Sequence, residues 1–201
     1  MLISHQKRFI FIHIPRTGGT SLRQLLLARV KDCQPLGFQH SGAHTEGETF
    51  FESYQSYLIF TVIRSPWSRI YSWYKLINHY APALCRPNQT FDDFIQALEH
   101  QKPRMHQVDN FHFNQLDYIL SRSGRLITNK VLRFENYRQE VTRLCSDLGL
   151  EGVTIPHLND VAGSSLPEAY SEYPFQAVAR LCARDIRYFN YPDSPFLPRL
   201  K

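Results

Sequence analysis

The sequence is poor in the residues that cross-link small secreted proteins and in the long apolar runs that cross membranes. It has four cysteines, Cys33, Cys85, Cys145 and Cys182, and no two of them form a C-x-x-C pair. A disulfide scaffold and a cysteine metal site are therefore not expected, and reduced thiols are the default. No apolar run approaches the ~20 residues of a membrane-spanning helix, and no signal peptide precedes the first strand-like segment. We expect a cytoplasmic protein with no transmembrane segment and no bound metal.

The sequence also lacks the lysine of a nucleoside-triphosphate-binding loop. The segment FIHIPRTGGTS, from Phe11 to Ser21, runs from apolar residues into a glycine-threonine-serine cluster, as such a loop does. The Walker A motif reads G-x-x-x-x-G-K-[ST], whereas here the first glycine is absent and Arg16 stands before the glycines. No strand end offers an evident carboxylate for Mg²⁺. These absences count against a nucleotide kinase or NTPase, which is one alternative function.

Apolar and aromatic residues, by contrast, are plentiful. Hydrophobic residues make up 43% of the chain, with 14 Phe and 11 Tyr, so a sizeable core is expected. The length suits a single domain over residues 1–201, because no repeat or low-complexity linker divides the chain. The formal charge of +5 fits an anionic partner or an ordinary solvated surface. No RNA-binding fingerprint is present, so nucleic acid is not expected as a partner.

Strand-like and helix-like patterns alternate along the chain. Buried β-rich runs predict three strands, at residues 8–14, 57–63 and 130–134. Apolar residues at helical spacing predict helices at residues 20–30, 66–77, 136–148 and 174–189, and one that begins after the N-cap Thr90. Polar, glycine-rich residues 37–47 are expected to form a loop. The alternation predicts an α/β fold with a central parallel sheet flanked by helices, and with ligands near the carboxyl ends of the strands.

The loop after the first predicted strand has the composition of an anion-binding site. Its residues are Arg16, Thr17, Gly18, Gly19, Thr20 and Ser21. Successive backbone N–H groups and the positive end of the following helix form an anion cradle, and the glycines permit close approach of the backbone. The hydroxyls and the guanidinium add further donors. The simpler interpretation is a plain turn capped by a threonine.

A second segment, FTVIRSPWSRIYS, carries further groups that can bind an anion. It places Arg64 at the carboxyl end of the second strand and Ser72 about two turns into the next helix. Their guanidinium and hydroxyl could converge on one further phosphate. Arg69 either joins them or faces solvent. For each of these three residues, an ordinary surface role is the alternative.

Together the two segments resemble the PAPS-dependent sulfotransferases, which use 3′-phosphoadenylyl sulfate as sulfuryl donor. The chain is most similar to the carbohydrate-type family 2 group, which includes bacterial members and the heparan and chondroitin enzymes. Its tail adds the segments VLRFENYRQEVTRLCSDLGL, IPHLND and ARDIRYFNYP, which resemble motifs of that group. The resemblance covers about residues 9–191, and the order and spacing of the motifs make it specific. It implies a P-loop-like three-layer sulfotransferase fold.

The resemblance also implies an activity and a set of binding residues. The chain would be an enzyme that moves a sulfuryl group from PAPS to an acceptor hydroxyl and releases PAP, the 3′,5′-bisphosphate. The first loop, residues 16–21, would hold the 5′-phosphosulfate, while Arg64 and Ser72 would hold the 3′-phosphate. The acceptor would be a glycan or another small molecule. The family usually has lysine in place of Arg16, and arginine keeps the charge but loses the compact donor that assists the leaving group.

Sulfuryl transfer to a hydroxyl also needs a general base. His40 fits the position of the histidine that family members carry between the two motifs. His44 is the second candidate, and Glu46 or Glu48 could substitute. Without the resemblance, each loop histidine is an ordinary surface residue.

The remaining candidates have weaker assignments. His157 and Asn159, in the segment IPHLND, align with a turn that closes over the nucleotide or acceptor, and local turn hydrogen bonding is the alternative. His13 is expected to be a packed core histidine. Phe134 and Trp67 are expected to be packing residues, although either could touch adenine. A non-catalytic module that binds PAP or an anionic glycan is the remaining alternative function.

Overall fold

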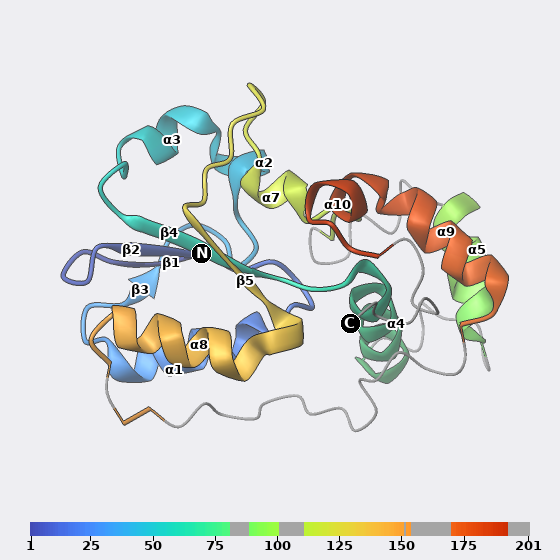
Figure 1. Cartoon of the computed structure of the whole chain (residues 1–201), viewed down its shortest axis with the longest axis horizontal. Coiled ribbons are helices and arrows are strands. Elements are labelled where there is room, and N and C mark those ends of the chain that lie inside the picture. Colours follow the sequence, from blue (N-terminus) through green and yellow to red (C-terminus); the bar gives the residue numbers. More distant parts are fainter. Residues whose placement is uncertain (81–88, 101–110, 151, 154–169, 193–201) are drawn as a thin grey trace. The chain divides into compact units, whose positions relative to one another are not determined.

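The computed structural model of the chain describes residues 1–80, 89–100, 111–150, 152–153 and 170–192 (Figure 1). The chain divides into two compact units. The first comprises Met1–Arg64 and Gln115–Asn159, and the second comprises Ser65–Asn114 and Asp160–Lys201. The sheet lies wholly in the first unit, whereas the named elements of the second unit are helices.

The first unit is built on a five-stranded sheet of order β3-β1-β2-β4-β5. The strands are β1 (Leu2–Ser4), β2 (Phe9–Ile12), β3 (Gln34–Pro35), β4 (Leu58–Ile63) and β5 (Lys130–Arg133). Strands β2, β4 and β5 run parallel, whereas β1 is antiparallel to both of its neighbours. The predicted fold class is therefore confirmed as mixed α/β with a mostly parallel central sheet flanked by helices.

The two antiparallel strands were not predicted from the sequence. β1 and β3 have three and two residues, too few for a hydrophobic period to be recognised. β1 reaches β2 through residues 5–8 alone, and a connection this short joins antiparallel strands, because parallel strands need a crossover. The predicted parallel pairing is found between β2, β4 and β5.

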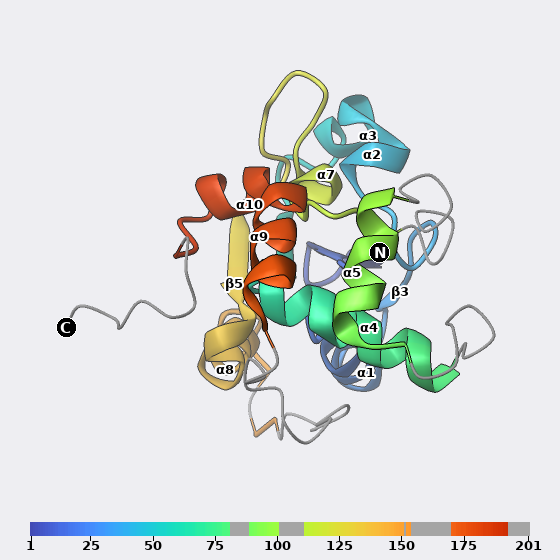
Figure 2. The ribbon, with the colours of Figure 1, turned by 90° about the vertical axis from the view of Figure 1, so that its right-hand side faces the viewer.

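Helices cover both faces of this sheet. α1 (Gly19–Arg29) and α8 (Tyr137–Asp147) lie side by side against one face (Figures 1 and 2). The short helices α2 (Ala43–Glu46), α3 (Glu48–Glu52) and α7 (Leu116–Ile119) lie on the other side. The prediction of a loop over residues 37–47 is wrong for Ala43–Glu46, which form the helix α2. Gly42 permits this turn, since a Cβ there would lie 2.3 Å from the carbonyl oxygen of Tyr118.

The core of the first unit fills the space between the sheet and the pair α1 and α8. Alternate residues of the strands point into it, as the two-residue side-chain period requires. Its buried members include Phe9, Phe11, Phe60, Val62, Leu132, Leu22, Leu25, Leu26, Val141 and Leu144. Cys145 is also buried in this core. This packing holds the β2–α1 loop on a fixed support.

The second unit consists of α4 (Pro66–Tyr80), α5 (Phe91–His100), α9 (Glu172–Leu181) and α10 (Ala183–Tyr188) in its described part. The single helix predicted over residues 174–189 is wrong, because Cys182 leaves helical geometry (φ −110°, ψ 22°) and separates α9 from α10. Thr90 caps α5 as predicted. Its backbone N–H and its hydroxyl both donate to Asp93 Oδ2 (3.0 and 2.7 Å).

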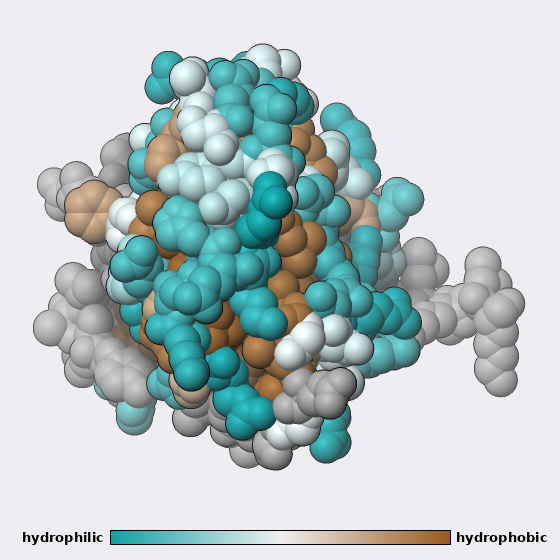
Figure 3. Space-filling view, turned by 90° about the vertical axis from the view of Figure 1, so that its left-hand side faces the viewer, coloured by the Kyte–Doolittle hydropathy of each residue, from teal (hydrophilic) through white to brown (hydrophobic). Residues whose placement is uncertain are grey.

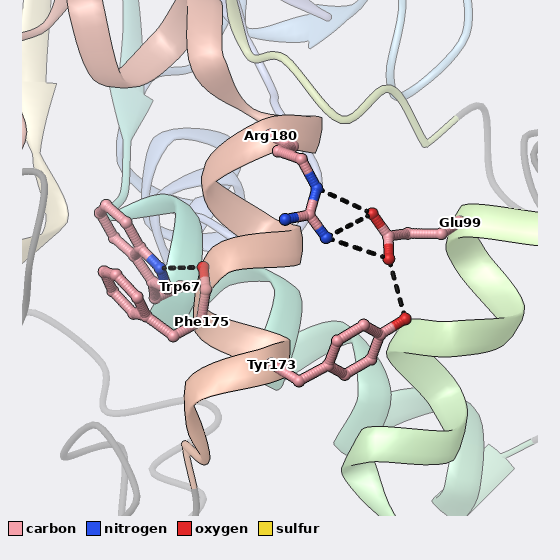
Figure 4. Close-up of polar contacts among 5 residues, drawn as sticks. All are labelled: Trp67, Glu99, Tyr173, Phe175 and Arg180. Atoms are coloured by element: carbon pink, nitrogen blue, oxygen red, sulfur yellow. Dashed lines mark hydrogen bonds and ion pairs between the residues drawn. The ribbon is translucent and has the colours of Figure 1, made fainter.

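Polar and aromatic contacts tie α9 to the helices around it (Figure 4). On one side, Glu99 of α5 accepts hydrogen bonds from Arg180 (3.0 Å) and from the hydroxyl of Tyr173 (2.8 Å). On the other side, Trp67 of α4 stacks on Phe175 at a centroid distance of 5.0 Å and donates from Nε1 to its carbonyl oxygen (3.2 Å). Trp67 is almost fully buried, which confirms its predicted packing role.

The surface at the end of the sheet where β2 and β4 begin is mainly hydrophilic. Figure 3 shows this face, with hydrophobic residues visible between hydrophilic ones. Among the described helices, none combines the length and apolar character that spanning a membrane requires. The opposite end of β2 and β4 is the one that leads into the predicted anion-binding loop.

Candidate active site

The predicted anion-binding loop joins β2 to α1 and has an unusual backbone. Gly18 is the N-cap of α1 and adopts a left-handed conformation (φ 82°, ψ 6°). Arg16 is also left-handed (φ 66°), which costs a residue with a Cβ about 1–3 kcal/mol. Such strain persists only where surrounding contacts determine the backbone, and it concentrates at functional sites.

Contacts from within the loop and from the β5–α8 region hold this backbone. The buried Thr17 hydroxyl donates to the carbonyl oxygen of Ile14 (2.9 Å). The Tyr137 hydroxyl donates to the carbonyl oxygen of Gly18 (2.9 Å), and burial raises the pKa of this phenol, so that it stays a donor. The Phe134 ring covers Gly18 so closely that a Cβ at that glycine would lie 2.8 Å from Cε2. A residue with a side chain is therefore disfavoured at position 18, because its Cβ would clash with Phe134 and its backbone would be strained.

Arg64 lies against the same loop. It follows directly after β4, its side chain is 6% exposed, and its Nη1 makes a long hydrogen bond of 3.4 Å to the carbonyl oxygen of Arg16. Its guanidinium carbon lies 4.1 Å from the centroid of the Phe134 ring. The side chain of Gln115 fixes its backbone, accepting from the Arg64 N–H (2.8 Å) and donating to the Arg64 carbonyl oxygen (2.9 Å). The structure thus brings together the first loop and Arg64, which are 48 residues apart.

Two histidines meet beside the loop. The rings of His13 and His40 are 4.7 Å apart, and His40 Nδ1 lies 2.8 Å from the carbonyl oxygen of His13. Since a carbonyl oxygen only accepts, His40 Nδ1 carries a proton, and in the neutral ring Nε2 has the lone pair. The His13 ring packs on α1 so tightly that a Cβ at Gly19 would lie 2.0 Å from its Cδ2.

Burial keeps His13 neutral. Its side chain is 3% exposed, and desolvation, followed by the charge of His40, lowers its pKa well below the usual 6.5. His13 was expected to be a core histidine, and its burial confirms this. His13 also contacts Gly19 of the loop and the candidate base His40, which the sequence did not indicate.

The other candidate bases have different surroundings. The His44 ring lies edge-on to Tyr118 at a centroid distance of 4.8 Å. Glu46 accepts a hydrogen bond from Thr45 (3.2 Å). Glu48 accepts a hydrogen bond from Ser123 (2.6 Å), which lowers the pKa of its carboxyl and makes it a weaker base. His40, by comparison, is hydrogen-bonded to the backbone of His13, just before the loop.

Several predicted site residues lie elsewhere. Ser72 is on α4 in the second unit, and its position relative to Arg64 stays a prediction. His157 and Asn159 lie outside the described residues. Arg69 neither faces solvent nor belongs to the first unit. It is fully buried in the second unit and donates to the carbonyl oxygens of Phe113 (2.9 Å) and His112 (3.0 Å).

Sequence reasoning missed the residues that support the loop. Gln115 contacts a residue 51 positions away, and Tyr137 contacts one 119 positions away, so no local spacing reveals them. Tyr137 lies three residues after Phe134, which was predicted as a packing residue that could also touch adenine. The positive φ of Arg16 likewise has no signal in the sequence, because it follows from the contacts of its neighbours.

The assembled loop has the electrostatics of an anion site. Gly18 has no side chain to accept from the first N–H groups of α1, and the first turn of α1 contains no acidic residue. Arg16 and Arg64 add two permanent cations. A strand, a loop of this kind and a helix, at the carboxyl end of a parallel sheet, form the arrangement in which α/β proteins commonly bind phosphate-like groups.

Comparison with known proteins identifies the family. The chain matches the sulfotransferase family over residues 1–192, and it therefore belongs to that family, as a family 2 sulfotransferase. Among solved structures, it is similar to a sulfotransferase from Alicyclobacillus acidocaldarius, with 15% sequence identity and a TM-score of 0.40. That match covers 69% of this chain and 55% of the other, so this chain spans little more than half of that protein's length. No curated protein sequence matches the chain.

Proposed function

We propose that this protein transfers a sulfuryl group from PAPS to the hydroxyl of an acceptor and releases PAP. The observation that carries the proposal is the contact of Arg64 with the β2–α1 loop, through the hydrogen bond to the carbonyl oxygen of Arg16. PAPS differs from ATP in its 3′-phosphate, so a donor site needs two anion-binding regions rather than one. The β2–α1 loop would supply the first of these regions, and Arg64, which contacts it, would supply the second.

In this proposal the loop binds the 5′-phosphosulfate. The backbone N–H groups at the start of α1 and the hydroxyls of Thr20 and Ser21 donate to its oxygens, and the guanidinium of Arg16 stabilises charge on the leaving phosphate. Thr17, Gly18 and Gly19 shape the cradle. Thr20 is exposed in the structure, which fits a direct contact with the donor.

Arg64 and Ser72 are proposed to bind the 3′-phosphate. A guanidinium suits this task because its planar edge donates two parallel hydrogen bonds to phosphate oxygens. Ser72 belongs to the second unit, so the proposal requires both units in one sulfotransferase domain over residues 1–201. The family match supports this, since it runs through both units. His157 and Asn159 are kept as proposed contacts to the nucleotide or acceptor.

His40 is the proposed general base. With Nδ1–H bonded to the carbonyl oxygen of His13, its Nε2 can accept the proton of the acceptor hydroxyl. The hydroxyl oxygen forms a bond to sulfur, the bond from sulfur to the bridging phosphate oxygen breaks, and its electron pair leaves with PAP. His44 is the reserve base. No step of this scheme uses a metal.

The proposed acceptor is a carbohydrate, which rests on the family resemblance alone. The direct test supplies sulfur-35 PAPS with a panel of hydroxyl-bearing glycans and small molecules and follows labelled product and PAP. Transfer with one PAP released per sulfuryl group supports the proposal. Tight PAP binding without transfer to any acceptor would instead indicate a non-catalytic binding module. Neither binding nor transfer would overturn the proposal.

If transfer is found, His40→Ala decides the base. Loss of the chemical step with PAP affinity retained supports His40. Transfer that survives this substitution moves the base to His44 or to a neighbouring glutamate, and His44→Ala in the same assay separates those two cases.

A further inference from the structure

Phe134 touches both parts of the proposed donor site. It follows β5 directly and begins a short 3₁₀ helix, Phe134–Asn136. Its edge covers Gly18, where an added Cβ would meet Cε2 at 2.8 Å and Cδ2 at 2.9 Å. Its ring also contacts the Arg64 guanidinium, whose carbon lies over the ring at 4.1 Å from the centroid. One side chain therefore contacts the N-cap of the cradle and the arginine assigned to the 3′-phosphate.

The contact places the cation of Arg64 over the face of an aromatic ring. A cation–π contact of this kind restricts the rotation of the side chain. It is not itself a hydrogen bond, so it is compatible with phosphate binding through guanidinium N–H groups. Since each ordered side chain costs conformational freedom on binding, an arginine held in place beforehand binds more tightly.

The backbone of Arg64 is restrained in the same way. The amide of Gln115 bonds both its N–H and its carbonyl oxygen. The backbone is thus fixed by Gln115, and the tip of the side chain is fixed by Phe134 and by the carbonyl oxygen of Arg16. Simple packing needs only an apolar side chain at position 134, whereas holding a cation needs an aromatic face.

We infer that Phe134 is a positioning residue that holds the Arg64 guanidinium ready for the 3′-phosphate of the donor nucleotide. The inference rests on the proposed function, because it assumes that Arg64 binds this phosphate. It assigns to Phe134 a role in selecting nucleotides that carry a 3′-phosphate, rather than contact with adenine.

Two ligands of known structure test this role by calorimetry: PAP, and AMP, which lacks the 3′-phosphate. Phe134→Leu keeps an apolar side chain over Gly18 but removes the aromatic face. We expect its affinity for PAP to fall about 3- to 30-fold, the range of a partly desolvated cation–π contact, with less than about a twofold change for AMP. Phe134→Tyr keeps the aromatic face and should retain the PAP affinity.

Two further variants make the result specific. In an Arg64→Gln background, Phe134→Leu should cause no further loss of PAP affinity, because the two residues act through one contact. Phe51→Leu changes a buried phenylalanine of α3 and should leave the ratio of PAP to AMP affinities unchanged. Far-ultraviolet circular dichroism of each variant checks that the fold is retained.

The outcomes separate this inference from the proposed function. Equal losses for PAP and AMP, or an undiminished effect in the Arg64→Gln background, would overturn the role of Phe134 while the proposed function stands. An absence of PAP binding by the unmodified protein would overturn the proposed function and this inference with it.

Discussion

At the scale of single residues, Arg16 combines a strained backbone with the one charged side chain of residues 16–21. Its left-handed φ of 66° has a similar cost for lysine and for alanine, which are both unbranched at Cβ, so these two substitutions differ mainly in the side chain beyond Cβ. A change in activity between them therefore reports on the charge and its donors.

We expect Arg16→Lys to keep sulfuryl transfer within about tenfold, because the cation is retained, and Arg16→Ala to lower kcat by about 10²- to 10³-fold, the usual cost of a lost transition-state donor. Initial rates with sulfur-35 PAPS measure both. Arg29→Ala, in the exposed last turn of α1, is the matched loss of charge and should change the rate little. A fully active Arg16→Ala variant would show that the backbone cradle suffices.

The lowered pKa of His13 makes the stability of the folded protein depend on pH. Its pKa in the folded protein is well below 6.5, so the unfolded chain binds more protons than the folded chain at acidic pH. The free energy of unfolding therefore decreases as the pH falls below about 6.5, through the interval between the unfolded and folded pKa values. Above that interval both states are neutral at this residue and it contributes no pH dependence.

His13→Gln removes the ionisable group and should flatten the decrease in stability between neutral and acidic pH. Urea unfolding at a series of pH values gives the slope. His5→Gln, on the exposed turn between β1 and β2, tests whether losing any histidine has the same effect. Equal slopes for His13→Gln and the unmodified protein would mean that the buried ring is not the source of the acid sensitivity.

At the scale of elements, the capping box of α5 offers the clearest stability test. The Thr90 hydroxyl accepts from the Asp93 N–H (3.2 Å) and donates to its carboxylate (2.7 Å). Thr90→Ala leaves both groups without this partner and should cost about 0.5–2 kcal/mol of unfolding free energy. Chemical denaturation measures the difference. Thr142→Ala, within α8, also removes a threonine from a helix but not a cap, and a loss of equal size there would contradict the argument.

Elements with a strong local signal are predictable from the sequence, and those without one are not. The runs that became β2 and β4 were recognised because they are apolar and buried. β5 was recognised as a short run ahead of a helical pattern, and the helices α4 and α5 because Pro66 and Thr90 mark their starts. The short strands β1 and β3 depend on pairing with their neighbours, β1 with β2 and β3 with β1, which no local pattern reveals. Cys182 divides α9 from α10 although the hydrophobic period continues across it.

The same distinction holds for the site. The loop residues 16–21 and Arg64 could be singled out from their place after a strand. Their mutual contact could not, because it depends on the parallel pairing of β2 with β4 and on Phe134 from beyond β5. Arg69 shows the opposite case: its spacing suggested either an anion ligand or a solvent-facing residue, whereas it is buried and holds the backbone of residues 112 and 113.

At the scale of the whole molecule, the proposal assigns two residues to one phosphate, Arg64 from the first unit and Ser72 from the second. A ligand that binds only the folded state stabilises it by about 2.7 kcal/mol at 100 times its Kd. If Arg64 and Ser72 hold the same phosphate, PAP should raise the Tm of both units together. Differential scanning calorimetry should then show a single transition with PAP.

Ser72→Ala should reduce the rise in Tm given by PAP but not the rise given by AMP, because it removes a donor to the 3′-phosphate only. Ser68→Ala, one turn earlier on α4, is the matched serine substitution and should leave both rises unchanged. An unaltered PAP effect in Ser72→Ala would separate α4 from the phosphate.

The hydrogen bonds between Gln115 and Arg64 have a topological consequence. The chain leaves the first unit after Arg64 and re-enters it at Gln115, so these two residues are the two ends of a long excursion. One amide side chain ties the ends together through two hydrogen bonds, of 2.8 and 2.9 Å. These two hydrogen bonds therefore join the ends of the segment 65–114. A force transmitted through residue 65 or residue 114 would act on these hydrogen bonds, and hence on the backbone of Arg64, which is proposed to bind the 3′-phosphate of the donor.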